Sequence, residues 1–206
     1  MNIYFVLFAV VFVVGITYGI IIDKYKVFPY GFIKTVYRRY IRRQKRGSND
    51  NLWSIGIYEG NTLFDLDARK NISNPVLTAK DVADIDAVFV ADPFMITKNG
   101  KYYIFFEVLN RKTNKFDIAY AESKDLAKWI YGKVVIEEKF NLSYPYVFEW
   151  NNSYYLIPES SQDFSVRLYK AKEFPAKWEY VKNLLSGYGY ADPSIFRYKD
   201  MWWLFV

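Results

Sequence analysis

The sequence predicts an all-β protein, an incomplete β-propeller of about three blades that follows one N-terminal transmembrane helix. Three observations support this fold class. The chain holds 20 Tyr, 17 Phe and 6 Trp, and aromatic residues favour strands. A motif of proline, tight turn and aromatic pair recurs about every 50 residues, a spacing typical of propeller blades. A long run without any charge stands near the N-terminus, as a membrane span requires.

The uncharged run covers residues 3–22, "IYFVLFAVVFVVGITYGIII". A helix of this length spans about 30 Å, the thickness of one hydrocarbon core. The alternative is a cleaved secretory signal peptide. No Lys or Arg precedes the run and no clear small-residue cleavage site follows it, so we expect a retained single-pass anchor over residues 1–23.

A basic segment follows over residues 24–50, and it carries all of the excess positive charge. Residues 1–50 hold nine Lys and Arg against two Asp, whereas residues 51–206 hold 19 Lys and Arg against 20 Asp and Glu. The positive-inside rule therefore predicts a membrane protein whose propeller lies on the cytoplasmic side. The segment is either an interfacial helix on anionic lipid headgroups or a solvated linker. A nucleic-acid-binding body is not expected, since residues 51–206 carry no positive excess.

The absence of two residue types limits the chemistry of the chain. It contains no Cys and no His, which excludes disulfides, thiol nucleophiles, Cys/His zinc sites and serine–histidine catalysis. Acid–base chemistry must then use Asp, Glu, Tyr or Lys. We name no metal-ligating residue, and the sequence does not identify a cofactor.

The repeat lies in the predicted propeller domain, residues 51–206. Three prolines, 52 and 48 residues apart, each begin a copy: Pro93, Pro145 and Pro193. Nine residues after each proline an aromatic pair starts, and a turn stands between: Asn99–Gly100, Asn151–Asn152 and Lys199–Asp200. Each copy therefore predicts a strand, a tight turn and a second strand. A β-sandwich with similar patterning is the alternative.

Two further strands complete each of the first two copies. The segments "DIAYAESKDLAKW" from Asp117 and "SVRLYKAKEFPAKW" from Ser165 each predict a third strand, a short turn and a Trp. The stretch before the next proline supplies a fourth strand. Upstream, "WSIGIYEG" at residues 53–60 is interpreted as part of another blade. Four short strands in each repeat are typical of a propeller.

Carboxylates at repeated positions form the candidate site. Asp92, Tyr144 and Asp192 each directly precede a repeat proline, so the propeller symmetry should bring them close to a common axis. Glu107 and Glu159 each follow their proline by fourteen residues. Converging carboxylates suit glycosidic chemistry, one as acid and another as base or nucleophile. We predict Asp92 and Asp192 as catalytic; the alternative is that they cap backbone N–H groups in turns.

The motifs also resemble a known family. The segments "WSIGIYEG", "NPVLTAKDV", "FVADPFM", "YYIFFE", "LSYPYVFEW", "YYLIPES", "FPAKW", "ADPSIF" and "WWLF" follow one another over residues 52–206. Together they resemble the N-terminal domain of glucosamine inositolphosphorylceramide transferase and its bacterial stand-alone relatives. The resemblance implies a five-bladed propeller like that of arabinanase- and xylosidase-type glycoside hydrolases. It also implies that transferase chemistry belongs to a separate C-terminal domain, which nothing here resembles.

The resemblance also shows where this chain departs from the pattern. Asp92 and Asp192 match the Asp-Pro carboxylates of the hydrolases, but Ser143 and Tyr144 stand where a general-acid Glu is expected before Pro145. Asn141 occupies a position that is usually His in the relatives, and an Asn hydrogen-bonds but does not titrate. We expect Asn141, Tyr144, Glu107 and Glu159 to contact substrate.

Three functions stay open at this point. Five blades of about 50 residues need about 250 residues after the anchor, and about 155 are present, so we interpret the chain as a fragment. The first function is a membrane-anchored propeller that binds a carbohydrate or glycolipid in its central channel during glycan assembly. The second is a non-catalytic scaffold that recruits a glycosyltransferase. The third is a glycosidase whose general acid lies in the missing blades.

Overall fold

The computed structural model describes residues 12, 17–18, 53–68, 70 and 72–206, and the chain divides into two units, Met1–Asp50 and Asn51–Val206. The predicted anchor and the basic segment lie outside the described residues, except for three single positions. No helix within the described part of the chain is long and apolar enough to cross a membrane. The anchor over residues 1–23 and the basic segment over residues 24–50 therefore stay predictions.

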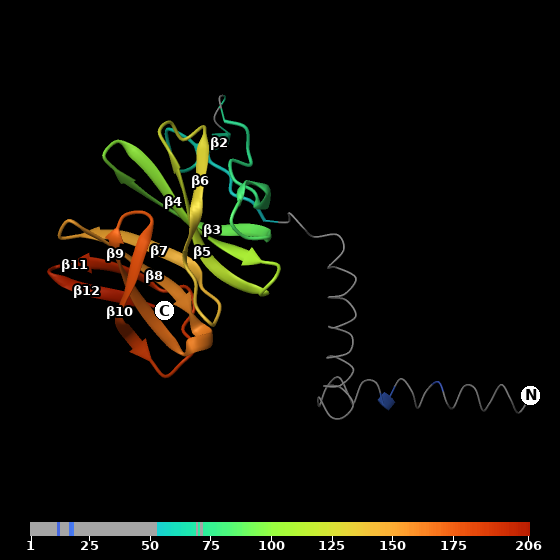
Figure 1. The fold of residues 1–206 in the computed structure, drawn as a ribbon, viewed down its shortest axis with the longest axis vertical. Helices are drawn as coiled ribbons and strands as arrows, with labels where there is room; N and C mark the ends of the chain where they lie inside the picture. Colours follow the sequence, from blue (N-terminus) through green and yellow to red (C-terminus); the bar gives the residue numbers. More distant parts are fainter. Residues whose placement is uncertain (1–11, 13–16, 19–52, 69, 71) are drawn as a thin grey trace, which may run out of the picture. The chain divides into compact units, whose positions relative to one another are not determined.

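The second unit is all-β, and its strands are antiparallel (Figure 1). The first four-stranded sheet, in sequence order, contains β3 (Ala87–Lys98), β4 (Lys101–Asn110), β5 (Lys115–Ser123) and β6 (Trp129–Ile136). The second contains β7 (Ser143–Trp150), β8 (Ser153–Ser160), β9 (Ser165–Glu173) and β10 (Lys177–Ser186). The third sheet has two strands, β11 (Ser194–Tyr198) and β12 (Met201–Phe205). These three sheets correspond to the three sequence repeats.

Short elements precede the first repeat. Strands β1 (Tyr58–Glu59) and β2 (Asp67–Ala68) form a two-stranded sheet, and Ile55 makes an isolated bridge to Leu77. A 3-10 helix, η1 (Ala79–Asp81), follows, and a second one, η2 (Ser161–Asp163), connects β8 to β9. Ile55 and Leu77 are 2% and 1% exposed and pack into the core of the first sheet, so this segment adds to that sheet's core.

The three predicted hairpin turns are present, and their backbone geometry explains the residues found there. Both central residues of every turn have positive φ: 50° and 74° at Asn99–Gly100, 48° and 57° at Asn151–Asn152, 47° and 61° at Lys199–Asp200. Positive φ at both positions is the mark of the turns that match strand twist, and Asn, Asp and Gly tolerate it best. These turns fix the register of the inner hairpin in each repeat.

The repeat prolines lie differently from the expectation that each begins a strand. Pro93 and Pro145 lie inside β3 and β7, where the pairing register shifts between Ala91 and Phe94 and between Ser143 and Tyr146. A β-bulge leaves one residue without a ladder partner, so a proline without an N–H is tolerated there. In the third repeat β11 begins at Ser194, directly after Pro193.

The aromatic residues form the packing between the first and second sheets. Phe105 is fully buried, and its ring lies 5.4 Å from Trp178 and 5.9 Å from Phe174 of the second sheet. The Phe174 ring also lies 4.1 Å from that of Tyr154 and 4.9 Å from that of Tyr103. Because aromatic pairs add to the burial of apolar area, this cluster joins the two sheets firmly.

Candidate functional site

Four carboxyl groups converge where the three repeats meet. They belong to Asp92 in β3, Glu107 in β4, Glu159 in β8 and Asp192 just before β11. The charges of the other three carboxyls raise the pKa of Glu107. The charge of Glu159 also raises the pKa of Asp92 and that of Asp192. The structure therefore brings together both predicted catalytic residues and both predicted glutamates.

Asp92 and Glu107 form the first pair. Glu107 lies opposite Ala91 in the β3–β4 ladder, next to the bulge that carries Asp92, and the two carboxyls share a hydrogen bond. Burial, together with the charges of Asp92, Glu159 and Asp192, raises the pKa of Glu107 to about 8. Glu107 is therefore protonated at neutral pH and donates this hydrogen bond to Asp92.

The environment of Asp92 combines opposing influences. Burial raises the pKa of Asp92, and the Glu159 charge adds to this, while hydrogen bonds from Glu107 and from the Tyr144 backbone N–H act the other way. The net result is a raised pKa. Asp92 is exposed, whereas Glu107 is only 8% exposed. Of the two carboxyls, Asp92 is therefore accessible to a ligand from solvent and Glu107 is buried.

Glu159 and Asp192 form the second pair, which connects two repeats. The Asp192 backbone N–H donates to Glu159 Oε2 at 3.0 Å, and the Ser161 hydroxyl donates to Glu159 Oε1 at 2.7 Å. The Asp192 side chain also hydrogen-bonds that of Glu159. Burial, then the Glu159 charge and this bond, raise the pKa of Asp192. Ser161 thus fixes the orientation of Glu159 and is a residue that the motif analysis missed.

The residues before the three repeat prolines share an unusual backbone conformation. Asp92, Tyr144 and Asp192 have φ of 50°, 47° and 48°, in the left-handed region that non-glycine residues seldom adopt. In two cases the backbone N–H of this residue is bound by a carboxylate of the preceding repeat: Tyr144 by Asp92 and Asp192 by Glu159. The cross-repeat bonds therefore hold a strained conformation, of a kind that clusters at functional sites.

The backbone N–H of Tyr144 contacts the carboxyl cluster through Asp92, and the Tyr144 ring packs against a neighbouring strand. The ring meets Phe94 edge-on with centroids 4.7 Å apart, and the hydroxyl lies 3.4 Å from Ser194 Oγ. Ser194 is a second residue that the motif analysis missed. The hydroxyl contact is long for an O–H···O hydrogen bond, so the ring packing with Phe94 is the stronger of the two contacts.

Asn141 makes its hydrogen bonds away from the carboxyls. Its side-chain oxygen accepts from the Phe116 backbone N–H at 3.2 Å, and its own backbone N–H donates to Gln162 Oε1 at 3.0 Å. Phe116 lies in β5 and Gln162 in η2, so Asn141 connects the first sheet to the second. None of its described hydrogen bonds places it beside Asp92 or Glu159.

The arrangement offers both donors and acceptors of protons. A protonated Glu107 lies beside Asp92, and two carboxyls whose environments separate their pKa values are the usual basis for assigning an acid and a base. Within the described residues, no group of three or more His, Cys, Asp or Glu side chains has a geometry that could hold a metal ion.

Comparison with known families gives a match over most of the chain. Residues 45–206 match the family model of the N-terminal part of glucosamine inositolphosphorylceramide transferase 1. The chain is 34% identical over 169 residues to a glucosamine inositolphosphorylceramide transferase 1 of Oryza sativa subsp. indica, and 30% identical over 174 residues to one of Arabidopsis thaliana. The alignments cover 75% and 77% of this chain and 23% of each relative.

Solved structures with a similar fold are glycoside hydrolases. The GH43 BlXynB protein of Bacillus licheniformis aligns with a TM-score of 0.53 and 14% identity, over 76% of this chain and 32% of that chain. A GH32 beta-fructofuranosidase of Bombyx mori aligns with a TM-score of 0.52 and 14% identity, over 71% and 34%. At this identity the likeness establishes a propeller-like fold and nothing about activity.

Proposed function

The chain belongs to the family of N-terminal domains of glucosamine inositolphosphorylceramide transferase 1, and from this premise we propose a membrane-anchored, carbohydrate-binding propeller that acts in glycan or glycolipid assembly. The chain spans about 23% of the length of its curated relatives. These relatives are named for glucosamine and inositolphosphorylceramide, so a sugar or glycolipid headgroup is the ligand class that we propose.

The carboxyl cluster is the observation that supports sugar binding. Four carboxyls from three repeats lie within electrostatic reach of one another, and one of them, Glu107, is protonated at neutral pH. Sugar hydroxyls both donate and accept hydrogen bonds. Ionised carboxylates accept from hydroxyls, and a protonated carboxyl donates to them. A site with both kinds of carboxyl therefore suits a sugar ring better than a uniformly charged site would.

If the site is catalytic, the geometry suggests the roles. Glu107 carries the proton and is buried, so it acts as the hydrogen-bond donor or acid, while Asp92 and Asp192 lie at the exposed side and face the ligand. Ser143 and Tyr144 still leave no carboxyl two residues before Pro145. A glycosidase built on the described residues would draw its general acid from Glu107.

A non-catalytic scaffold that recruits a glycosyltransferase is the second candidate. The observation that favours it is that carboxylates already hold the backbone of the next repeat: Asp92 binds the Tyr144 N–H and Glu159 binds the Asp192 N–H. Carboxylates used in this way stabilise the boundaries between sheets without any ligand. Substitution of Asp92 separates this role from the first.

The test compares Asp92→Asn with Asp200→Asn, a matched change at an exposed turn. Both variants and the wild type are assayed for hydrolysis of chromogenic aryl glycosides and for binding to a glycan array. If the site is catalytic, Asp92→Asn lowers turnover by about 100-fold or more and keeps binding. Loss of binding alone supports a sugar-binding propeller. Unchanged turnover and binding in Asp92→Asn would leave only the scaffold.

The membrane topology is a separate proposal, which rests on the uncharged run at residues 3–22 and the basic residues after it. We place the propeller on the cytoplasmic side. The chain has no Cys, so Lys112→Cys in the exposed β4–β5 turn gives a single thiol. A membrane-impermeant maleimide should label it only after the cells are lysed. Labelling in intact cells would reverse the orientation, and recovery in the soluble fraction would exclude an anchor.

A further inference from the structure

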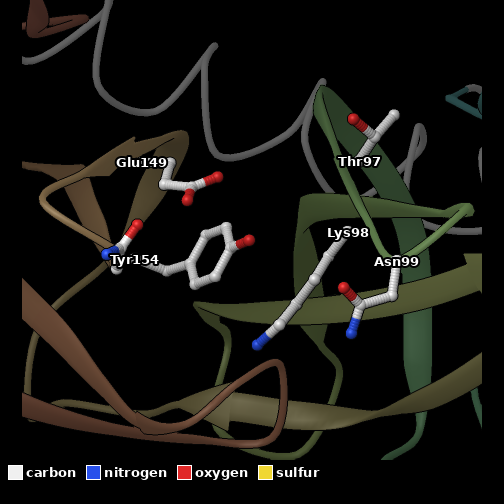
Figure 2. Close-up of a pocket in the computed structure, with 6 residues that line it drawn as sticks. Thr97, Lys98, Asn99, Glu149 and Tyr154 are labelled. Atoms are coloured by element: carbon white, nitrogen blue, oxygen red, sulfur yellow. The ribbon is translucent and has the colours of Figure 1, made fainter.

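A polar pocket lies between the inner hairpins of the first and second sheets. Its volume is about 390 Å³, within the range of small-molecule sites. Six side chains line it: Thr97, Lys98 and Asn99 from the β3–β4 hairpin, and Glu149, Asn152 and Tyr154 from the β7–β8 hairpin. Figure 2 shows Lys98 and Asn99 facing Tyr154 and Glu149 across the hollow. All six side chains carry a polar group.

The pocket is separate from the carboxyl cluster. Lys98 follows Asp92 by six residues in β3, and Glu149 follows Tyr144 by five in β7. At about 3.3 Å per residue the two sites are roughly 15–20 Å apart along each strand. The carboxyls lie at the bulges and the pocket lies at the hairpin turns, so a ligand of one sugar ring cannot occupy both.

Lys98 is held in the pocket without a carboxylate partner. Its Nζ lies 4.7 Å from the centre of the Tyr154 ring and 4.9 Å from that of Phe174, and it makes no ion pair with any residue that the structure describes. The two rings attract the ammonium group and restrict its position. Its three N–H donors are therefore positioned beside the hollow and are not occupied by a protein anion.

The repeat shows that the fold does not need a lysine here. Lys98 stands five residues after Pro93, and Trp150 stands five residues after Pro145; Tyr154 and Trp202 each stand nine residues after their proline. At the second boundary Trp150 meets the Trp202 ring edge-on with centroids 5.7 Å apart. Aromatic packing thus occupies that position at one boundary, whereas the other boundary holds a cation and a hollow.

The lining chemistry indicates the class of ligand. Lys98 supplies donors, Glu149 supplies acceptors, and Thr97, Asn99 and Asn152 supply both. One positive and one negative side chain balance, so neither an anion nor a cation is favoured overall. We propose that this pocket is a second binding site, for a neutral saccharide, whose hydroxyl groups donate and accept in the same way. This proposal stands independently of the function assigned to the carboxyl cluster.

The test uses the matching residue of the neighbouring repeat. Lys98→Trp introduces the side chain found at Trp150 and should fill the pocket as the second boundary is filled. The full chain is titrated with methyl glycosides of glucose, galactose, mannose and arabinose by saturation-transfer NMR. We expect saturable binding of at least one glycoside, and Lys98→Trp should weaken it by about tenfold or more. Lys112→Trp, the same change in the exposed β4–β5 turn, should have no effect.

A second variant keeps the test decisive if Lys98→Trp unfolds. Thr97→Val preserves the shape of the side chain and removes its hydroxyl, so it should weaken binding by about three- to tenfold and leave thermal unfolding unchanged. Absence of saturable binding to all four glycosides would overturn the proposal. So would binding that survives both Lys98→Trp and Thr97→Val, or binding that Asp92→Asn abolishes while Thr97→Val leaves it intact, because the ligand would then occupy the carboxyl cluster.

Discussion

The ammonium of Lys98 lies over the Tyr154 ring at the boundary between the first and second sheets, whereas Trp150 meets Trp202 at the same repeat positions of the next boundary. One boundary leaves a polar hollow and the other has aromatic packing. Both boundaries join inner hairpins of similar backbone geometry. The difference shows that the ends of the hairpins accept different side chains. The conformation of each turn depends on its own two central residues and not on the side chains packed between neighbouring sheets.

Other repeat positions show no such freedom. Trp129 and Trp178 each donate from the indole nitrogen to the carbonyl three residues earlier, at 3.0 Å to Leu126 and 2.8 Å to Pro175. Asp92 and Asp192 share their left-handed backbone with Tyr144. The Trp residue and its hydrogen bond are the same in both repeats, and the left-handed backbone before the proline is kept even where Tyr144 replaces Asp, whereas Lys98 and Trp150 at the hairpin ends differ. A difference at an otherwise repeated position, such as Lys98, therefore marks chemistry that belongs to one boundary alone, whereas the repeated carboxyls Asp92 and Asp192 belong to the site that the repeats share.

A second difference between the repeats concerns a buried acid. Asp117 in β5 and Ser165 in β9 hold equivalent places, since each pairs with the residue that follows the repeat glutamate: Val108 after Glu107 and Ser160 after Glu159. Ser165 donates a hydrogen bond to Asp163 at 2.7 Å. Asp117 is 1% exposed, and neither carboxyl oxygen has a hydrogen-bond partner. Lys115 Nζ lies 3.8 Å away and compensates the charge in part.

The largest expected effect is a loss of stability when an aromatic residue is removed from the first sheet, compared with the same change in the third. Phe105 and Phe205 both stand twelve residues after their repeat proline, yet Phe105 is fully buried and Phe205 is 56% exposed. Phe105→Ala should lower the free energy of unfolding by about 3–5 kcal/mol, because it leaves a cavity between two sheets. Phe205→Ala should cost about 0.5 kcal/mol or less. Chemical denaturation of both variants measures the difference; equal losses would contradict the exposure of Phe205.

The next effect is a pH dependence that arises from Glu107. Its pKa rises from 4.5 to about 8 on folding, so the folded protein holds this proton more tightly than the unfolded chain does. The resulting stabilisation is complete below pH 4.5 and is lost as the pH rises toward 8. At about 1.36 kcal/mol per pKa unit the full shift corresponds to about 5 kcal/mol, and solvent around the exposed Asp92 and Asp192 screens it, so we expect Glu107→Gln to remove roughly 2 kcal/mol of this dependence.

Urea unfolding from pH 4.5 to pH 8.5 measures the Glu107 effect. Glu173→Gln, at an exposed ion pair with Lys177, is the matched control and should keep the wild-type profile. A Glu107→Gln profile that still falls across this range in parallel with the wild type would show that Glu107 is not the group responsible.

The smallest expected effect tests Asp117 against Ser165. Burial raises the pKa of Asp117 from 3.8 to about 6, so the ionised carboxylate destabilises the fold above that pH. The full shift corresponds to about 3 kcal/mol, but a buried Asn amide without hydrogen-bond partners costs part of it, so Asp117→Asn should increase the free energy of unfolding by about 1 kcal/mol at pH 8 and have little effect at pH 4. Thermal unfolding at the two pH values checks this. Destabilisation at pH 8 would mean that the ion pair with Lys115 outweighs the burial of the charge.

Much of the fold followed from repeated residues. The proline, turn and aromatic-pair spacing predicted the inner hairpins of all three sheets. The segments from Asp117 and Ser165 predicted the third strand of the first two sheets, and the stretch before the next proline predicted the fourth. The bulges at Pro93 and Pro145 were not foreseen, because a strand-start proline and a bulge proline have the same local sequence.

The sequence by itself determined the all-β class, the repeat period, the turn geometry and the absence of Cys and His chemistry, since these depend on neighbouring residues or on composition. Only the tertiary structure decided which carboxyls pair, that Glu107 is buried and protonated, that Asn141 bonds to Phe116, and that Lys98 faces a hollow. These features depend on contacts between residues 15 to 100 positions apart, and local pattern contains no information on such contacts.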